Sequence, residues 1–159
     1  MNKKFDPRFM QLAIKEARKN ILSMDGGPFG ACIVKSGKVI AVGRNTVLVS
    51  DASCHAEINT IRAASRKLKN FDLSGCVIYS TTEPCPMCFS AIHWARIDAV
   101  VYGTTIDDVK KMGFNELRIT ATQLKKIGKS RVGVYGNFLR DECKLLLGDW
   151  ADTSYKRLY

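Results

Sequence analysis

The spacing of apolar residues predicts an alternation of helices and strands along the chain. A first helix is expected after Asp6 and Pro7, because aspartate can cap a helix and proline fits its first position. It runs to about Asn20, with an apolar face formed by Phe9, Leu12, Ala13 and Ala17. Further helices are expected over residues 55–68, 85–96, 107–112 and 138–147.

Short apolar runs predict the strands. Residues 30–34 and 39–43 flank Ser36-Gly37-Lys38, so they are expected to form a β-hairpin. Three more strands are expected over residues 76–80, 99–103 and 132–135. This order predicts an α/β fold, a three-layer α/β/α domain with a mixed central sheet. We expect residues 1–159 to form one domain, in which residues 148–159 are a C-terminal tail.

Composition supports one compact domain. The 159 residues are 46% hydrophobic and 25% charged, which suits a chain with a substantial core. No run is long and apolar enough to cross a membrane, and the first residues lack the apolar centre of a signal peptide. A cytoplasmic location without a membrane partner is therefore the default expectation.

The charge balance raises the question of nucleic acid. The formal net charge is +10, and such a basic balance makes a nucleic-acid partner worth considering. The densest basic stretch, residues 125–131, carries no aromatic side chain that could stack on a base. We therefore favour a solvated surface there, and nucleic acid is the less favoured partner.

Two short motifs carry the candidate chemistry. One is His55-Ala-Glu57, at the start of a predicted helix, and the other is Pro84-Cys-Pro-Met-Cys88, after a predicted strand. His55, Cys85 and Cys88 can supply three ligands and leave one position open, which is typical of catalytic zinc. Glu57 is then the natural proton carrier. The combined pattern is a signature of zinc-dependent nucleobase deaminases.

Residues of these types also serve other purposes in proteins. A C-x-x-C pair can be redox-active, and a structural zinc site could be completed by Cys54 or His93. Cys54 adjoins His55, so both could hardly reach one ion, and His93 is turned away from the cysteines on a helix. Cys32 and Cys76 lie in apolar runs and are expected to be buried thiols, with no disulfide framework.

The whole chain resembles the cytidine-deaminase-like superfamily, and within it most closely the bacterial guanine deaminases. The residues that carry the resemblance are Gly26-Gly-Pro-Phe-Gly30, Asn45, His55-Ala-Glu57, Glu83-Pro-Cys-Pro-Met-Cys88, Ala91-Ile-His-Trp-Ala-Arg96, Gly113-Phe114, Trp150 and Tyr159. The resemblance implies zinc bound by His55, Cys85 and Cys88, with Glu57 as proton shuttle. It also implies a homodimer, in which the tail can come from the partner subunit.

The resemblance further implies a set of substrate-binding residues. Asn45 matches an asparagine that hydrogen-bonds the purine, and Phe29 and Trp94 match aromatic residues near the flat base. Glu116 matches a pocket carboxylate that is often aspartate in the family, and Tyr159 matches a tyrosine that closes the pocket. The structural alternatives are a turn residue at Asn45, core aromatics at Phe29 and Trp94, and a solvated glutamate at Glu116.

Four functions compete at this point. The favoured one is hydrolysis of free guanine, a small-molecule purine, to xanthine and ammonia. The second is a tRNA adenosine deaminase, which must bind an RNA stem and flip its base. The third is a deaminase of guanosine, cytosine or a related heterocycle, and the fourth is a catalytically silent RNA-binding or scaffold module. A tail carrying Trp150, Tyr155 and Tyr159 favours free guanine, because it can dock over the site and exclude a large nucleic acid.

Overall fold

The structure, a computed structural model, describes residues 4–159, so the expectation about the start of the chain falls partly on residues 1–3, outside that range. The described residues form α1 (Pro7–Ser23), β1 (Gly30–Lys35), β2 (Lys38–Arg44), α2 (Ala56–Leu68), β3 (Cys76–Thr82), α3 (Pro86–Trp94), β4 (Ala99–Thr104), α4 (Ile106–Lys111), α5 (Ala121–Ile127), β5 (Gly133–Tyr135) and α6 (Arg140–Ala151). No helix in this range is long and apolar enough to cross a membrane.

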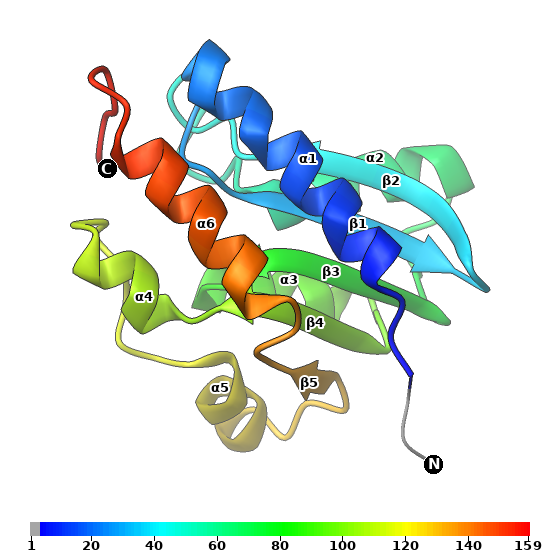
Figure 1. Cartoon of the computed structure of the whole chain (residues 1–159). Helices are drawn as coiled ribbons and strands as arrows, with labels where there is room; N and C mark the ends of the chain where they lie inside the picture. The colour runs from blue at the N-terminus through cyan, green and yellow to red at the C-terminus, as the bar shows by residue number, and fades with distance from the viewer. Residues whose placement is uncertain (1–3) are drawn as a thin grey trace.

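The strands form one mixed sheet in the order β2-β1-β3-β4-β5. β1 is antiparallel to both β2 and β3, whereas β3, β4 and β5 run parallel. Helices α1 and α6 cover one face of the sheet, and α2 and α3 cover the other (Figure 1). The predicted three-layer α/β fold with a mixed sheet is therefore confirmed.

The central strands are apolar because they are buried on both faces of the sheet. β4 is buried along its whole length, and β1 along all but its last residue, since helices shield both faces. Cys32 and Cys76 are fully buried, as expected for small apolar side chains in strands. The sheet packs one core cluster against the α2–α3 layer and another against the α1–α6 layer.

The parallel strands β3 and β4 end at the same edge of the sheet. β3 ends at Thr82 and is followed within three residues by Cys85, while β4 ends at Thr104. In α/β sheets, ligand sites favour the crevice beyond the carboxyl ends of parallel strands. The cysteine motif therefore lies where a site is expected.

Two helices differ from the prediction. α5 lies in a segment expected to be irregular and polar, and a capping box of Thr120 and Gln123 starts it. Ala121 is its one buried residue, so no apolar periodicity marks it in the sequence. α6 continues to Ala151 instead of ending at Leu147, so residues 148–151 of the expected tail are helical.

Candidate active site

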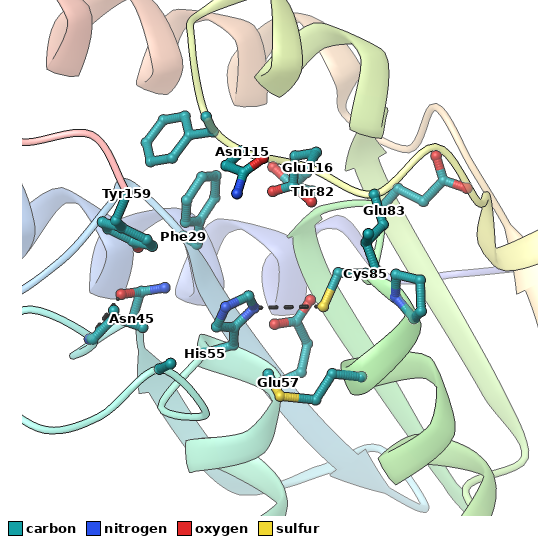
Figure 2. Close-up of a pocket in the computed structure, with 16 residues that line it drawn as sticks. Phe29, Asn45, His55, Glu57, Thr82, Glu83, Cys85, Asn115, Glu116 and Tyr159 are labelled. Carbon is teal, nitrogen blue, oxygen red and sulfur yellow. Dashed lines mark hydrogen bonds between the residues drawn. The ribbon is translucent and has the colours of Figure 1, made fainter.

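Three potential metal ligands converge at the starts of two helices. His55 is the N-cap residue of α2, Cys85 is the N-cap residue of α3, and Cys88 lies in the first turn of α3. Their ligand atoms all lie within 4.8 Å of one another, and His55 Nδ1 is 3.6 Å from Cys85 Sγ (Figure 2). Neither side chain makes a capping hydrogen bond to the backbone of its helix, so both are available for a ligand.

The other candidate ligands lie elsewhere. Cys54 Sγ donates to Asp51 and accepts from Arg62, each at 3.4 Å. His93 Nδ1 is 2.9 Å from Ser130 Oγ. In residues 4–159, the group able to hold a metal is therefore His55, Cys85 and Cys88, which argues against a structural site completed by Cys54 or His93.

The electrostatics of this group suit a cation. Hydrogen bonds from Cys88 and His55 outweigh burial and lower the pKa of Cys85 to about 4. The bond to Cys85, together with burial, raises the pKa of Cys88 well above its usual value. Although burial opposes its charged form, the hydrogen bond to Cys85 raises the pKa of His55. Cys85 is thus the sulfur that loses its proton more readily, and a cysteine must be deprotonated to bind a metal.

The donor set fits zinc. One imidazole nitrogen and two cysteine sulfurs are ligands that zinc prefers, and three protein ligands leave a fourth position for water or substrate.

Glu57 lies beside this group in the first turn of α2. Its carboxyl group is buried, and Ser80 Oγ donates a hydrogen bond to its Oε1 at 3.0 Å. Burial, reinforced by the negative charge of Cys85, raises the pKa of Glu57. A carboxyl group that holds a proton more readily than usual is suited to proton transfer.

The group opens into a pocket of about 380 Å³ (Figure 2). Its walls contain four of the expected substrate residues, Phe29, Asn45, Glu116 and Tyr159, together with His55, Glu57, Cys85, Val47, Ala52, Thr82, Glu83, Pro86, Met87, Phe114, Asn115 and Leu117. Seven of these 16 residues are site residues expected from the sequence, and the structure brings the wall together from segments more than 100 residues apart.

Trp94 is the exception among the expected substrate residues. It is the last residue of α3, its side chain is 75% exposed, and it does not line the pocket. A contact between Trp94 and substrate therefore stays a prediction, without support from a single chain.

Asn45 presents a polar group with no partner. It follows β2 and is 1% exposed, and its Oδ1 accepts from Val47 N at 3.0 Å. Its Nδ2 is buried without a hydrogen-bond partner among the described residues, and Figure 2 shows it on the pocket side. Because buried donors are normally paired, this amide indicates the place of an acceptor on a ligand.

Tyr159 lines one side of the pocket of its own chain. Its hydroxyl accepts from Gly27 N at 3.0 Å, and its carbonyl accepts from Asn115 N at 3.2 Å. Its ring packs edge-on against Phe114 at 5.5 Å, and burial raises its pKa to about 12. The tyrosine is thus held neutral between the glycine loop and the segment after α4.

Glu116 comes from that same segment. It is partly buried, and burial, followed by the negative charge of Cys85, raises its pKa. The structure places it in the wall of the pocket rather than at a solvated helix end. Among the residues that sequence reasoning missed is Ser80, since nothing in an apolar strand pattern marks the hydroxyl that holds Glu57.

Comparison with known proteins agrees with this geometry. Residues 3–104 match the family model of the cytidine and deoxycytidylate deaminase zinc-binding region. A guanine deaminase of Bacillus subtilis (strain 168) is 43% identical over 109 residues, covering 68% of this chain and 70% of the relative. A tRNA-specific adenosine deaminase of Buchnera aphidicola (subsp. Schizaphis graminum) is 34% identical over 152 residues, covering 91% and 93%.

Solved structures extend the likeness to the fold. A guanine deaminase from Nitrosomonas europaea superposes with a TM-score of 0.82 at 31% identity, covering 91% of this chain and 84% of that one. The match to the family model, the ligand triad and the shared fold agree. The chain belongs to the cytidine and deoxycytidylate deaminase family and is an aminohydrolase.

Proposed function

We propose that the protein hydrolyses free guanine to xanthine and ammonia, with zinc held by His55, Cys85 and Cys88. The observation that supports guanine as the substrate is the unpaired Asn45 amide, which faces the same pocket as the Glu116 carboxyl group. Guanine offers ring acceptors to an amide donor and an N–H edge to a carboxylate acceptor. The pocket thus presents both kinds of partner to one flat base.

The residues divide the reaction between them. When bound, zinc supplies a water that loses a proton near neutral pH. Glu57 takes up the two protons of the attacking water in turn; it delivers one to the ring nitrogen beside the attacked carbon and the other to the amino group, so that the carbon–nitrogen bond breaks and ammonia leaves. Ser80 keeps the Glu57 carboxyl group in place. Asn45 and Glu116 orient the base, and Tyr159 with Phe114 excludes bulk water.

Deamination of adenosine in tRNA is the second candidate. The Buchnera relative and the net charge of +10 favour it. The docked Tyr159 counts against it, because a flipped nucleotide must bring its ribose and backbone to the same opening. A pocket of about 380 Å³ suits a free base better than a base attached to a duplex.

One substrate panel tests the proposal. Zinc-loaded protein is incubated with guanine, guanosine, adenine, cytosine, cytidine and a tRNA anticodon stem, and products are separated by chromatography. We expect xanthine from guanine and little or no product from the RNA. Deamination of the RNA stem without turnover of guanine would overturn the proposal.

The metal is tested separately: elemental analysis should find about one zinc per chain.

The role of Glu116 is tested within the same assay. Glu116→Gln should lower kcat/KM for guanine by a larger factor than any change in zinc content or stability explains. If the melting temperature alone changes, Glu116 is structural.

We also propose a homodimer, on the basis of the family resemblance and of an apolar surface on α3. Met87 and Trp94 lie seven residues apart, on one face of the helix, and are 38% and 75% exposed. Native mass should show a dimer that Trp94→Ala weakens, whereas Leu22→Ala, at an 88% exposed position on α1, should not. A monomer at working concentration would contradict this.

Guanine hydrolysis would place the enzyme in purine metabolism, with the cytoplasm as its expected compartment.

A further inference from the structure

Glu83 is a buried carboxylate that the proposed reaction does not use. It directly precedes the Pro84-Cys85 step, and it is 5% exposed. Its Oε2 accepts from Ile106 N at 3.2 Å, and its Oε1 accepts from Ala121 N at 2.9 Å. Figure 2 shows this carboxylate pointing away from His55 and Cys85. With both oxygens occupied by backbone N–H groups, it is not placed to carry protons.

The two donors are the first residues of two helices. Thr105 caps α4 and Thr120 caps α5, and in each capping box the threonine side chain accepts from the third residue of the helix. This leaves the N–H of the first helical residue, Ile106 or Ala121, without an intrahelical partner. Glu83 accepts from both, so one side chain completes the starts of two helices.

These two helices bracket a wall of the pocket. The segment between them, residues 112–120, carries Phe114, Asn115 and Glu116 to the site. Glu83 N also donates to Thr104 O at 2.8 Å, which ties the same residue to the end of β4. Glu83 therefore bonds to three positions, namely the end of β4 at Thr104, the start of α4 and the start of α5. Because Glu83 lies two residues before Cys85, these bonds connect all three positions to the backbone of the cysteine motif.

We propose that Glu83 is a positioning residue that sets the distance between the metal-ligand motif and the substrate wall that carries Glu116. Its two side-chain bonds span 23 and 38 residues of sequence, so no local contact can replace them. Loss of one bond frees one end of residues 112–120, and the wall then meets the base in the wrong place. The predicted effect falls on substrate binding, because Glu57 and its Ser80 bond belong to other elements.

Hydrogen exchange tests the geometry without any activity measurement. In the intact protein, the amide hydrogens of Ile106 and Ala121 should exchange slowly. In Glu83→Gln, the amide side chain keeps one acceptor and points a donor at the second N–H group. Protection should therefore fall at Ile106 or Ala121, and exchange should rise over residues 113–118. Unchanged protection at both amides would overturn the proposal.

Steady-state kinetics test the consequence, which rests on the proposed guanine activity. Glu83→Gln should raise KM for guanine roughly tenfold or more, with a smaller fall in kcat and unchanged zinc content. Glu83→Asp keeps the charge but is one methylene shorter, so it should give an intermediate KM; it also serves if the glutamine variant folds poorly. Ile14→Ala, in the core on the far side of the sheet, provides matched destabilisation and should leave KM unchanged.

Failure of the proposed guanine activity can be distinguished from failure of the proposed role of Glu83. If the intact protein does not turn over guanine, the proposed function fails, and Glu83 is then tested by exchange and by KM for the substrate that the panel identifies. If guanine is turned over and Glu83→Gln changes KM no more than Ile14→Ala at an equal loss of melting temperature, Glu83 is merely structural.

Discussion

Hydrogen bonds hold two polar side chains of the pocket, Glu57 and Asn45, through one atom each. Glu57 is held through one oxygen by Ser80, at the buried end of the pocket. Asn45 is held through its oxygen by Val47 N, while its Nδ2 has no partner among the described residues. Each side chain is thus fixed at one end and open at the other. Such anchoring preserves geometry at the moment when charge moves.

The proton carrier can be tested by an isosteric change. In Glu57→Gln the amide cannot accept and release a proton, so kcat for guanine should fall by about 10² to 10⁴. Zinc content and melting temperature should stay near those of the unmodified protein. Ser80→Ala keeps the carboxylate and should cost less. Near-normal turnover in the glutamine variant would remove Glu57 from the mechanism.

The Asn45 amide can be displaced without being mutated. A Cβ placed on Gly26 would lie 2.1 Å from Asn45 Oδ1, so Gly26→Ala must push the amide away. Loss of about one hydrogen bond to the base should lower kcat/KM roughly tenfold. Gly148→Ala is the control, because its Cβ would meet nothing within 4 Å. Equal kinetics for the two variants would show that Asn45 does not bind the base.

At the scale of elements, the last turn of α1 joins two segments of the pocket wall. Asn20 is fully buried, and its Nδ2 donates to Gly27 O and to Asn45 O, both at 2.8 Å. Its Oδ1 accepts from Arg44 Nε at 3.0 Å, which fixes the orientation of the amide. One side chain thus holds the glycine loop against the end of β2.

Removing that amide should disturb stability and binding together. Asn20→Ala leaves two buried carbonyl groups without their donor, at a cost on the order of 1–3 kcal/mol each. We expect a lower melting temperature and a raised KM for guanine, because Gly27 and Asn45 lose their common anchor. Ile14→Ala on the same helix should lower the melting temperature alone. An Asn20→Ala variant with unchanged KM would show that the loop is positioned by other contacts.

The elements that sequence predicted well are those with a full apolar face. α1, the β1–β2 hairpin and the buried strands β3 and β4 lie close to their expected ranges. α5 was missed because it buries Ala121 alone, and α6 is longer than predicted because Trp150 packs on Phe114 across the chain. Tertiary contact, rather than local pattern, decides both.

The same division holds for the site. The ligand triad follows from two local motifs, whereas the bonds made by Ser80 and Glu83 join residues that lie 23 to 38 positions apart. No sequence periodicity records such bonds. The resemblance to a family indicated Asn45, Glu116 and Tyr159 as substrate residues, but it could not provide their partners.

At the scale of the whole molecule, the pocket combines two parts of the chain. His55, Glu57 and Cys85 lie in the part that matches the family model, which ends at residue 104. Glu116 and Tyr159 lie beyond it, and they meet the first part across the pocket. The docked tail joins them, since Tyr159 bonds Gly27 on one side and Asn115 on the other.

Shortening the tail tests whether it closes the site. Deletion of residues 156–159 removes both bonds of Tyr159 and opens the pocket to water. Guanine turnover should fall sharply, while zinc content, folding and the native mass of the dimer stay the same. Tyr155→Ala, at a 79% exposed position, should have no effect on turnover. Full activity in a dimeric truncated protein would exclude a role in closure.

The meeting of two chain segments across one pocket bears on how such enzymes diverge. The reacting centre sits on α2 and α3, whereas residues 112–120 and 152–159 form a wall that reaches it from outside. Mutations in that wall can accumulate without disturbing the ligand triad or the proton carrier. Ancestral copies of such a gene could therefore change substrate while keeping their chemistry. A graft of these two segments from a relative of different specificity is therefore expected to change the preference among bases, while Asn45 still offers its amide to the ligand.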